Sequence, residues 1–141
     1  MGYTVAQAAK RMNLTAYTIR YYDREGLLPN VERGKAGNRI FNRDDMETLA
    51  LICCLKRTGM PIREIKQFTD WQNEGNRTLH AREAMLLEHR DKIGRQIDDL
   101  KKNLSLLARK LEYYHDACEA YDAGAPVPIC CECALLSERG R

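Results

Sequence analysis

Apolar residues recur at helical spacing near the start of the chain. Thr4 and Gln7 have the spacing of a capping box, and the apolar residues around them are Val5, Ala8, Ala9 and Met12. This pattern predicts a first helix over residues 5–12. Thr15 is placed to cap a second helix over residues 16–24, and three residues separate the two helices. Two short helices joined in this way are typical of a helix-turn-helix.

The next segment combines turn residues with short apolar runs. Residues 34–38 are Gly-Lys-Ala-Gly-Asn, a turn that leads into an extended stretch at 39–41. Together they predict a small hairpin, or wing. Asn42 can cap a third helix that continues through Thr58. Pro61 fits the first turn of a fourth helix, because proline lacks the amide that the first turn leaves unpaired.

The longest helix is predicted between residues 79 and 114. This stretch has no proline, and Gly94 is its only glycine. Apolar residues spaced alternately four and three apart are Ile93, Ile97, Leu100, Leu104, Leu107, Leu111 and Tyr114. A repeat of about 3.5 residues is typical of a coiled coil. Because such a stripe needs a partner, we expect a homodimer, with an intramolecular or different partner as the alternative.

Charge is distributed unevenly along the chain. The formal net charge is +3. Residues 1–43 hold eight basic and three acidic side chains, a net of +5, whereas residues 44–141 hold 15 basic and 17 acidic ones, a net of −2. This distribution favours a polyanion-binding head on a body that contacts protein. An ordinary solvated basic face is the alternative interpretation.

Other features of the sequence exclude several classes of protein. No apolar run approaches the roughly 18 residues of a membrane span, and the N-terminus lacks the regions of a signal peptide. We therefore expect a cytoplasmic protein that does not contact membranes. No Ser-His-Asp arrangement, HExxH motif or phosphate-binding glycine loop is present, and His80 and His89 lie in a polar segment where we expect them to be solvated. An enzyme is not expected.

The second predicted helix carries the residues suited to reading DNA. In a helix-turn-helix, the N-terminal residues of the second helix meet base edges in the major groove. Ile19 and Tyr22 would pack inward, and the opposite face carries Tyr17, Thr18, Arg20, Tyr21 and Arg24. Arginine pairs with guanine or phosphate, while threonine and tyrosine hydroxyls supply positioning contacts. The alternative, packing of the aromatic rings in a core, applies to Tyr22 and Tyr21.

Two motifs in this region resemble those of the MerR transcriptional regulators. Residues 18–28 read TIRYYDREGLL and residues 37–41 read GNRIF, and the likeness continues to about residue 118. The resemblance implies a mainly all-α fold: a winged helix-turn-helix head with a two-stranded wing, followed by a long helix that pairs as an antiparallel coiled coil. It also implies DNA contacts from Tyr17, Thr18, Arg20, Tyr21 and, in the wing, Arg39. Asn38 stands where the family often has an aromatic residue.

The resemblance further implies how such a protein acts. A homodimer binds a palindrome in double-stranded promoter DNA whose spacer is overlong, and distorts it so that RNA polymerase engages both promoter elements. On this basis the predicted domains are a DNA-binding domain at 1–75, a dimerisation helix at 76–118 and a cysteine-rich tail at 119–141 that holds a possible effector site.

Two interpretations of the signal stay open, and the first concerns Cys54. Residues 54–83 resemble the branch of the family that responds to aldehydes, other electrophiles or nitrosative stress, and Cys54 matches its sensor position. Positive charge favours the reactive thiolate, and Lys56 and Arg57 are close in sequence. The alternative is that Cys53 and Cys54 are small core residues, as most buried free cysteines are.

The second interpretation is a soft-metal site in the tail. Its candidate ligands are Cys118, Cys130, Cys131 and Cys133, with His115 one turn before Cys118. Three or four sulfur ligands suit zinc, copper(I) or another thiophilic ion. Metal-sensing relatives also place paired cysteines after the long helix, although many carry another near its start, where this chain has Leu79 and His80. A thiol-rich end without metal is the alternative, and no cofactor is required by the first interpretation.

Overall fold

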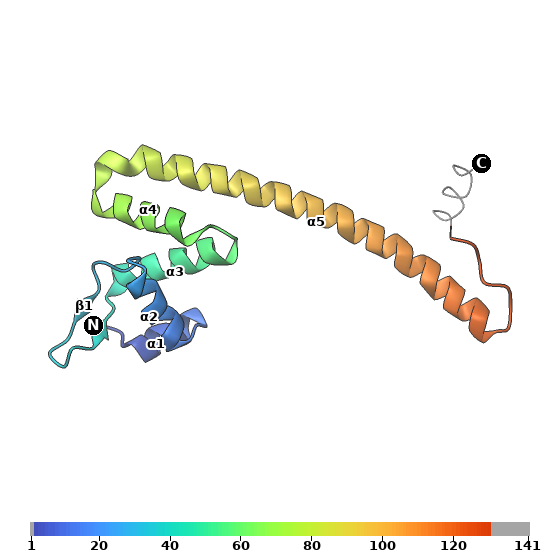
Figure 1. Ribbon diagram of the computed structural model, residues 1–141, viewed down its shortest axis with the longest axis horizontal. Helices are drawn as coiled ribbons and strands as arrows, with labels where there is room; N and C mark the ends of the chain where they lie inside the picture. The colour runs from blue at the N-terminus through green and yellow to red at the C-terminus, as the bar shows by residue number, and fades with distance from the viewer. Residues whose placement is uncertain (1, 131–141) are drawn as a thin grey trace. The chain divides into compact units, whose positions relative to one another are not determined.

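The computed structural model describes residues 2–130, which are mainly helical, as the sequence predicts. The chain divides between Ile93 and Gly94 into two compact units, and the division falls inside the longest helix. Figure 1 labels the helices α1 (Val5–Met12), α2 (Ala16–Arg24), α3 (Arg43–Arg57), α4 (Ile62–Asn73) and α5 (Leu79–Asp122). Among the described residues, no helix is both long and apolar enough to span a bilayer.

The helix-turn-helix has the predicted bounds. Thr4 caps α1 in a capping box: its hydroxyl accepts from the Gln7 amide at 3.2 Å, and the Gln7 side-chain oxygen accepts from the Thr4 amide at 2.9 Å. Asn13 ends α1 in the left-handed conformation, with φ of 54°. Asparagine tolerates that region better than most residues, and it allows the sharp turn into α2. The Thr15 hydroxyl then caps α2 by accepting from the Thr18 amide.

The wing consists of two short antiparallel strands. Strand β1 (Glu32–Arg33) pairs with β2 (Arg39–Ile40) so that Glu32 lies opposite Ile40. The extended stretch predicted at 39–41 continues beyond β2, and Phe41 pairs with Tyr3 ahead of α1 rather than with the other strand of the wing. Their backbones exchange hydrogen bonds of 2.7 and 2.8 Å, and the Phe41 ring is fully buried. The base of the wing is therefore attached to the start of the chain.

Helices α3 and α4 follow the wing. Asn42 caps α3 as predicted, in a second capping box with Asp45. The prediction for Pro61 is wrong by one position: Pro61 is the N-cap of α4, and the helix begins at Ile62. The ψ of 146° at Pro61 is extended, so this residue lies just outside the first turn.

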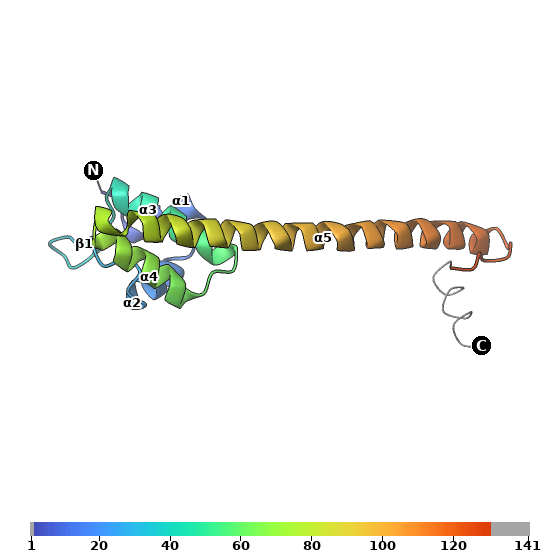
Figure 2. The same cartoon turned by 90° about the horizontal axis from the view of Figure 1, so that it is seen from above.

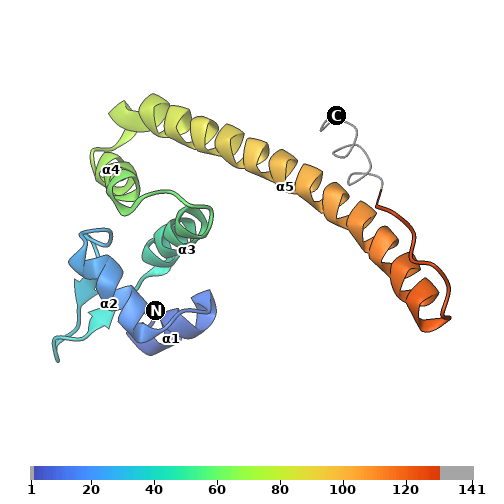
Figure 3. The same ribbon diagram turned by 45° about the vertical axis from the view of Figure 1, so that its right-hand side comes forward.

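A single apolar core joins the wing to α1–α4. Helix α1 packs on α2 and α3, and α3 packs on α4. Figure 3 shows α2, α3 and α4 following one another in this unit. The largest fully buried side chains are Ile19, Leu27, Phe41, Leu49, Ile52, Met60 and Ile65. These residues come from α2, α3, α4 and the segments beside them, and α1 adds the buried Ala8 and Ala9. The core therefore fixes α2 against the rest of the unit.

Helix α5 begins within the first unit. A 3-10 turn, Asn76–Thr78, leads into it, and the buried Thr78 hydroxyl donates to the Trp71 carbonyl at 2.5 Å. In Figures 1 and 2 the first turns of α5 lie alongside α4. The helix ends at Asp122, eight residues beyond the predicted end at 114. No helix-breaking residue intervenes before Gly124, which has a φ of 69°.

The second unit contains the rest of α5 and the segment that follows it. The predicted apolar stripe is exposed here: Leu100 and Leu104 are each 66% accessible and Leu111 is 69% accessible. After α5 the chain returns along the helix, since the Tyr113 hydroxyl donates to the Pro128 carbonyl at 3.0 Å. The apolar face of α5 has no cover from the described part of this chain.

Candidate nucleic-acid interface

The inner face of α2 is anchored as the sequence predicts. Ile19 is fully buried and Tyr22 is 4% exposed, and both belong to the core. Burial raises the pKa of the Tyr22 phenol above its ordinary value, so this ring remains neutral throughout the physiological range. These two anchors determine which residues of α2 face outward.

The outer face of α2 presents a mixed aromatic and basic surface. The Tyr17 ring is 69% exposed, with the Arg24 guanidinium 5.7 Å from its centroid, and Arg20 is exposed. The Thr18 hydroxyl lies 3.0 Å from the hydroxyl of the capping residue Thr15. Tyr21 is half-buried and lies 6.0 Å from the Tyr22 ring. Of the predicted contacts on α2, Tyr17 and Arg20 are therefore the most accessible to a bound duplex.

Arg39, the predicted wing contact, is bonded to the recognition helix. Its Nε donates to Asp23 Oδ2 on α2 at 2.5 Å, and its side chain is only 18% exposed. Arg33, on the other strand, lies 3.9 Å from the same carboxylate and also donates to the Gly37 carbonyl. Asp23 thus holds both strands of the wing against α2.

A hollow lies between the wing, α2 and the start of α1. Its volume is about 370 Å³, and its walls include Arg20, Arg33, Arg39, Asn38 and the residues 4–6 that begin α1. Three guanidinium groups and a helix N-terminus favour an anion, and phosphate oxygens of a DNA backbone match this chemistry. Sequence reasoning did not single out Arg33, whose only signal was its place in the basic N-terminal segment.

The paired cysteines of α3 have different environments. Cys53 is buried and Cys54 is exposed. Burial raises the pKa of the Cys53 thiol above its ordinary value, which reduces its thiolate fraction. Arg57, a predicted positive neighbour of Cys54, donates instead to the Met12 carbonyl at the end of α1, over 3.1 Å. Of the two thiols, only that of Cys54 is accessible to a reagent in solvent.

The tail cysteines are described only in part. Cys118 is exposed near the end of α5, and the half-buried Cys130 lies 3.3 Å from the Lys110 ammonium. The predicted ligands Cys131 and Cys133 lie outside the described residues. Within residues 2–130, the histidine, cysteine and acidic side chains form no cluster of three or more suited to a metal ion.

The sequence and structure were compared with those of known proteins. Residues 3–72 match the family described as MerR HTH family regulatory protein, and residues 46–109 match MerR, DNA binding. An uncharacterized HTH-type transcriptional regulator of Haemophilus influenzae is 43% identical over 117 residues, 83% of this chain and 87% of the relative. The HTH-type transcriptional regulator AdhR of Bacillus subtilis is 37% identical over 89 residues, 63% of this chain and 64% of the relative.

A solved structure extends the likeness to the fold. The crystal structure of HiNmlR, a MerR family regulator lacking the sensor domain and bound to promoter DNA, superposes with a TM-score of 0.78. It is 41% identical, and the match covers 89% of this chain and 97% of that one. The matched regions include the recognition helix, the wing and the long helix, and these relatives are regulators rather than enzymes. This chain therefore belongs to the MerR family of DNA-binding transcriptional regulators.

Proposed function

We propose that this regulator is switched by a thiol-reactive signal, an aldehyde, another electrophile or a nitrosating agent, that modifies Cys54. The observation that carries the proposal is the exposure of the Cys54 side chain on α3, inside the DNA-binding unit, beside the buried Cys53. An exposed thiol gains little from packing, since buried cysteines are the ones that behave as small apolar residues. Because α3 contributes to the core, a modification of Cys54 can change how this helix packs on its neighbours.

The likeness to a regulator without a sensor domain supports a signal received inside this unit. HiNmlR lacks that domain, and almost all of its length matches this chain. With this organisation, the effector acts on the helix-turn-helix, on α3 and α4 or on α5. Cys53 and Cys54 are the thiols of the described chain that lie before α5, and Cys54 is the exposed one.

The chemistry needs no cofactor. An aldehyde would react with Cys54 by addition: the sulfur bonds to the carbonyl carbon, the C=O π bond breaks and the oxygen takes the proton that the thiol loses. The product is a hemithioacetal, with no net oxidation or reduction. The added group enlarges the side chain on the last turns of α3.

We further propose that the protein acts as a homodimer on a promoter palindrome and presents the distorted DNA to RNA polymerase. The apolar stripe of α5 supports the dimer, because six of its members are large and at least 46% exposed: Ile97, Leu100, Leu104, Leu107, Leu111 and Tyr114. Apolar surface of this extent on one helix face is typical of an interface. A second copy of α5 in antiparallel orientation supplies a matching stripe.

A soft metal ion bound by the tail is the second candidate function. The tail holds closely spaced cysteines, and the chain leading to them returns along α5, where Tyr113 bonds to Pro128. This return shortens the path between Cys118 and Cys130 relative to an extended chain. A thiolate at Cys130 would exchange its contact with Lys110 for the metal.

One experiment separates the two candidates. The mass and metal content of protein purified without chelator are measured before and after mild formaldehyde treatment, together with its affinity for promoter DNA. The variants are Cys54→Ser and the triple substitution of Cys130, Cys131 and Cys133 by serine. An adduct and a change in DNA binding that only Cys54→Ser abolishes support the thiol switch. Stoichiometric metal lost only from the triple variant supports the metal site. Formaldehyde treatment that leaves Cys54 unmodified, or that modifies it without changing DNA binding, contradicts the thiol switch.

A further inference from the structure

The last turn of α3, which follows Cys54, is bonded on two sides. Arg57 donates to the carbonyl of Met12 at the end of α1, over 3.1 Å. The Thr58 hydroxyl lies 2.7 Å from Nε2 of His89 on α5. All of these residues belong to the first compact unit. A single helical turn therefore joins the helix-turn-helix to the first turns of α5.

The backbone of Cys54 is part of the same network. Its carbonyl accepts from the Thr58 amide at 3.1 Å and from the Thr58 hydroxyl at 2.8 Å. A threonine hydroxyl has one proton, so the proton that it gives to the carbonyl is not available to His89. An imidazole that carries its proton on Nε2 completes this arrangement by donating to the Thr58 oxygen. Hydrogen bonds weaken steeply when they are bent or stretched. A displaced Cys54 carbonyl would therefore disturb its own bond to Thr58 and the bond between Thr58 and His89.

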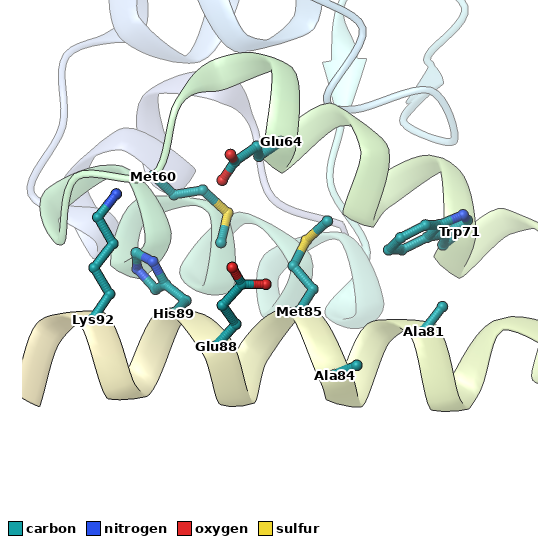
Figure 4. Close-up of a pocket in the computed structure, with 9 residues that line it drawn as sticks. All are labelled: Met60, Glu64, Trp71, Ala81, Ala84, Met85, Glu88, His89 and Lys92. Carbon is teal, nitrogen blue, oxygen red and sulfur yellow. The ribbon is translucent and has the colours of Figure 1, made fainter.

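His89 lies on the wall of a hollow between α4 and α5. The expectation that this residue is solvated is wrong, because the side chain is half-buried and bonded to Thr58. The hollow has a volume of about 440 Å³, and its lining includes Met60, Trp71 and Met85. Figure 4 shows His89 on α5 next to Lys92, with Met60 on the opposite wall. The hollow leaves room for this part of α5 to shift against the end of α3.

We propose that Thr58 and His89 are positioning residues that transmit a modification of Cys54 to α5. The inference rests on the proposed thiol switch and assigns its internal route. A bulky group on Cys54 displaces the last turn of α3, Thr58 moves with the Cys54 carbonyl, and His89 moves with Thr58. The apolar stripe that would pair two copies lies further along α5. A displacement of the first turns of this helix would therefore be passed along the helix to the dimer interface.

The test uses the full-length protein and N-ethylmaleimide, which adds a thiol across its C=C bond. Peptide mass spectrometry measures the extent of modification at Cys54, and hydrogen exchange measures the amides of residues 85–93 before and after modification. Thr58→Ser keeps the hydroxyl, whereas Thr58→Val removes it at nearly constant volume. His89→Leu removes the imidazole that bonds to Thr58, and Cys54→Ser is the control for reaction at other thiols.

We expect modification to change exchange in residues 85–93 by about threefold or more in the wild type and in Thr58→Ser, since a net hydrogen bond has about this effect on a local equilibrium. In Thr58→Val and His89→Leu, Cys54 should react at the wild-type rate without the distant change. A distant change that persists in either folded variant, or that is absent from the wild type, overturns the inference.

A parallel measurement separates this inference from the proposed function. The affinity for a duplex selected from a random pool by the unmodified protein is measured before and after Cys54 modification. If modification of Cys54 does not change the DNA affinity of the wild type, the thiol switch is refuted, and the transmission route with it. If modification changes the DNA affinity of the wild type and of Thr58→Val equally, only the route through Thr58 and His89 is refuted.

Discussion

Asp23 on α2 and Arg39 on the wing form an ion pair that joins these two elements, with 2.5 Å between the carboxylate oxygen and the guanidinium Nε. Both side chains are at least three-quarters buried. An arginine that lies on a wing strand and bonds to α2 fixes the angle between the two elements. The pair therefore holds the wing in a defined position relative to α2, the two elements for which we predict DNA contacts.

Breaking this ion pair should loosen the wing. We expect Asp23→Asn to lower the free energy of unfolding by about 1 kcal/mol, a value discounted for partial solvent access. Chemical denaturation of Asp23→Asn, Arg39→Gln and the double variant measures the coupling between the two residues. The double variant should be little less stable than either single one. Strictly additive losses would show that the pair contributes nothing.

Two of the arginines around the wing hollow, Arg33 and Arg20, should differ in how they affect DNA binding. We expect Arg33→Ala to weaken binding to all duplexes alike and to reduce the salt dependence by about one phosphate contact. Arg20→Ala should also relax sequence preference, because Arg20 is exposed where α2 would meet bases. Arg77→Ala, a matched loss of charge outside the hollow, is the control. An unchanged salt slope in Arg33→Ala would remove the hollow from the interface.

The exposed stripe of α5 predicts the effect of a charge on assembly. Leu104 is 66% exposed on that stripe, and Ser105 is an exposed neighbour whose hydroxyl bonds to the Lys101 carbonyl. We expect Leu104→Lys to shift the protein to monomers in sedimentation velocity, since it buries an unpaired ammonium in the proposed interface. Ser105→Lys should leave assembly unchanged. Equal behaviour of the two variants would contradict pairing through this stripe.

Burial of the Cys53 thiol predicts a pH dependence of stability. The folded-state pKa is raised, so the neutral form is favoured in the folded chain and the unfolded chain ionises first. Stability from this residue is therefore complete below the unfolded thiol pKa of about 8.5 and is lost as the pH rises through the folded value. Denaturation at pH 7.5 and 9.5 should show a larger loss for the wild type than for Cys53→Ala. A difference of the opposite sign would contradict the assignment.

Local sequence patterns predicted most of the helical elements. The bounds of α1 and α2 follow from side chains within three residues of each start, Thr4, Gln7 and Thr15, whose capping bonds form within one turn. The inward orientation of Ile19 and Tyr22 also follows from helical periodicity alone. These features are local, so no knowledge of distant contacts is needed to infer them.

Three features required the tertiary structure. The partner of Phe41 is one of them: its backbone pairs with Tyr3, which is 38 positions earlier, and not with the other strand of the wing. His89 was expected to be solvated, and this was wrong because its side chain bonds to the Thr58 hydroxyl. The periodicity of the helix that holds His89 gives no information on a contact with a residue 31 positions away. The sequence placed Arg33 in a basic segment but gave no indication that it shares a hollow with Arg20 and Arg39.

The sequence by itself determined the order of the helices, the outward face of α2 and the apolar stripe of α5, because each depends on the spacing of residues along one element. Only the tertiary structure decided which side chains meet across elements. Asp23 with Arg39, and Thr58 with His89, are separated by 16 and 31 positions. Such contacts depend on how the core closes, since the wing is held through the buried Phe41 and the start of α5 packs on the same core through Met85 and Leu86.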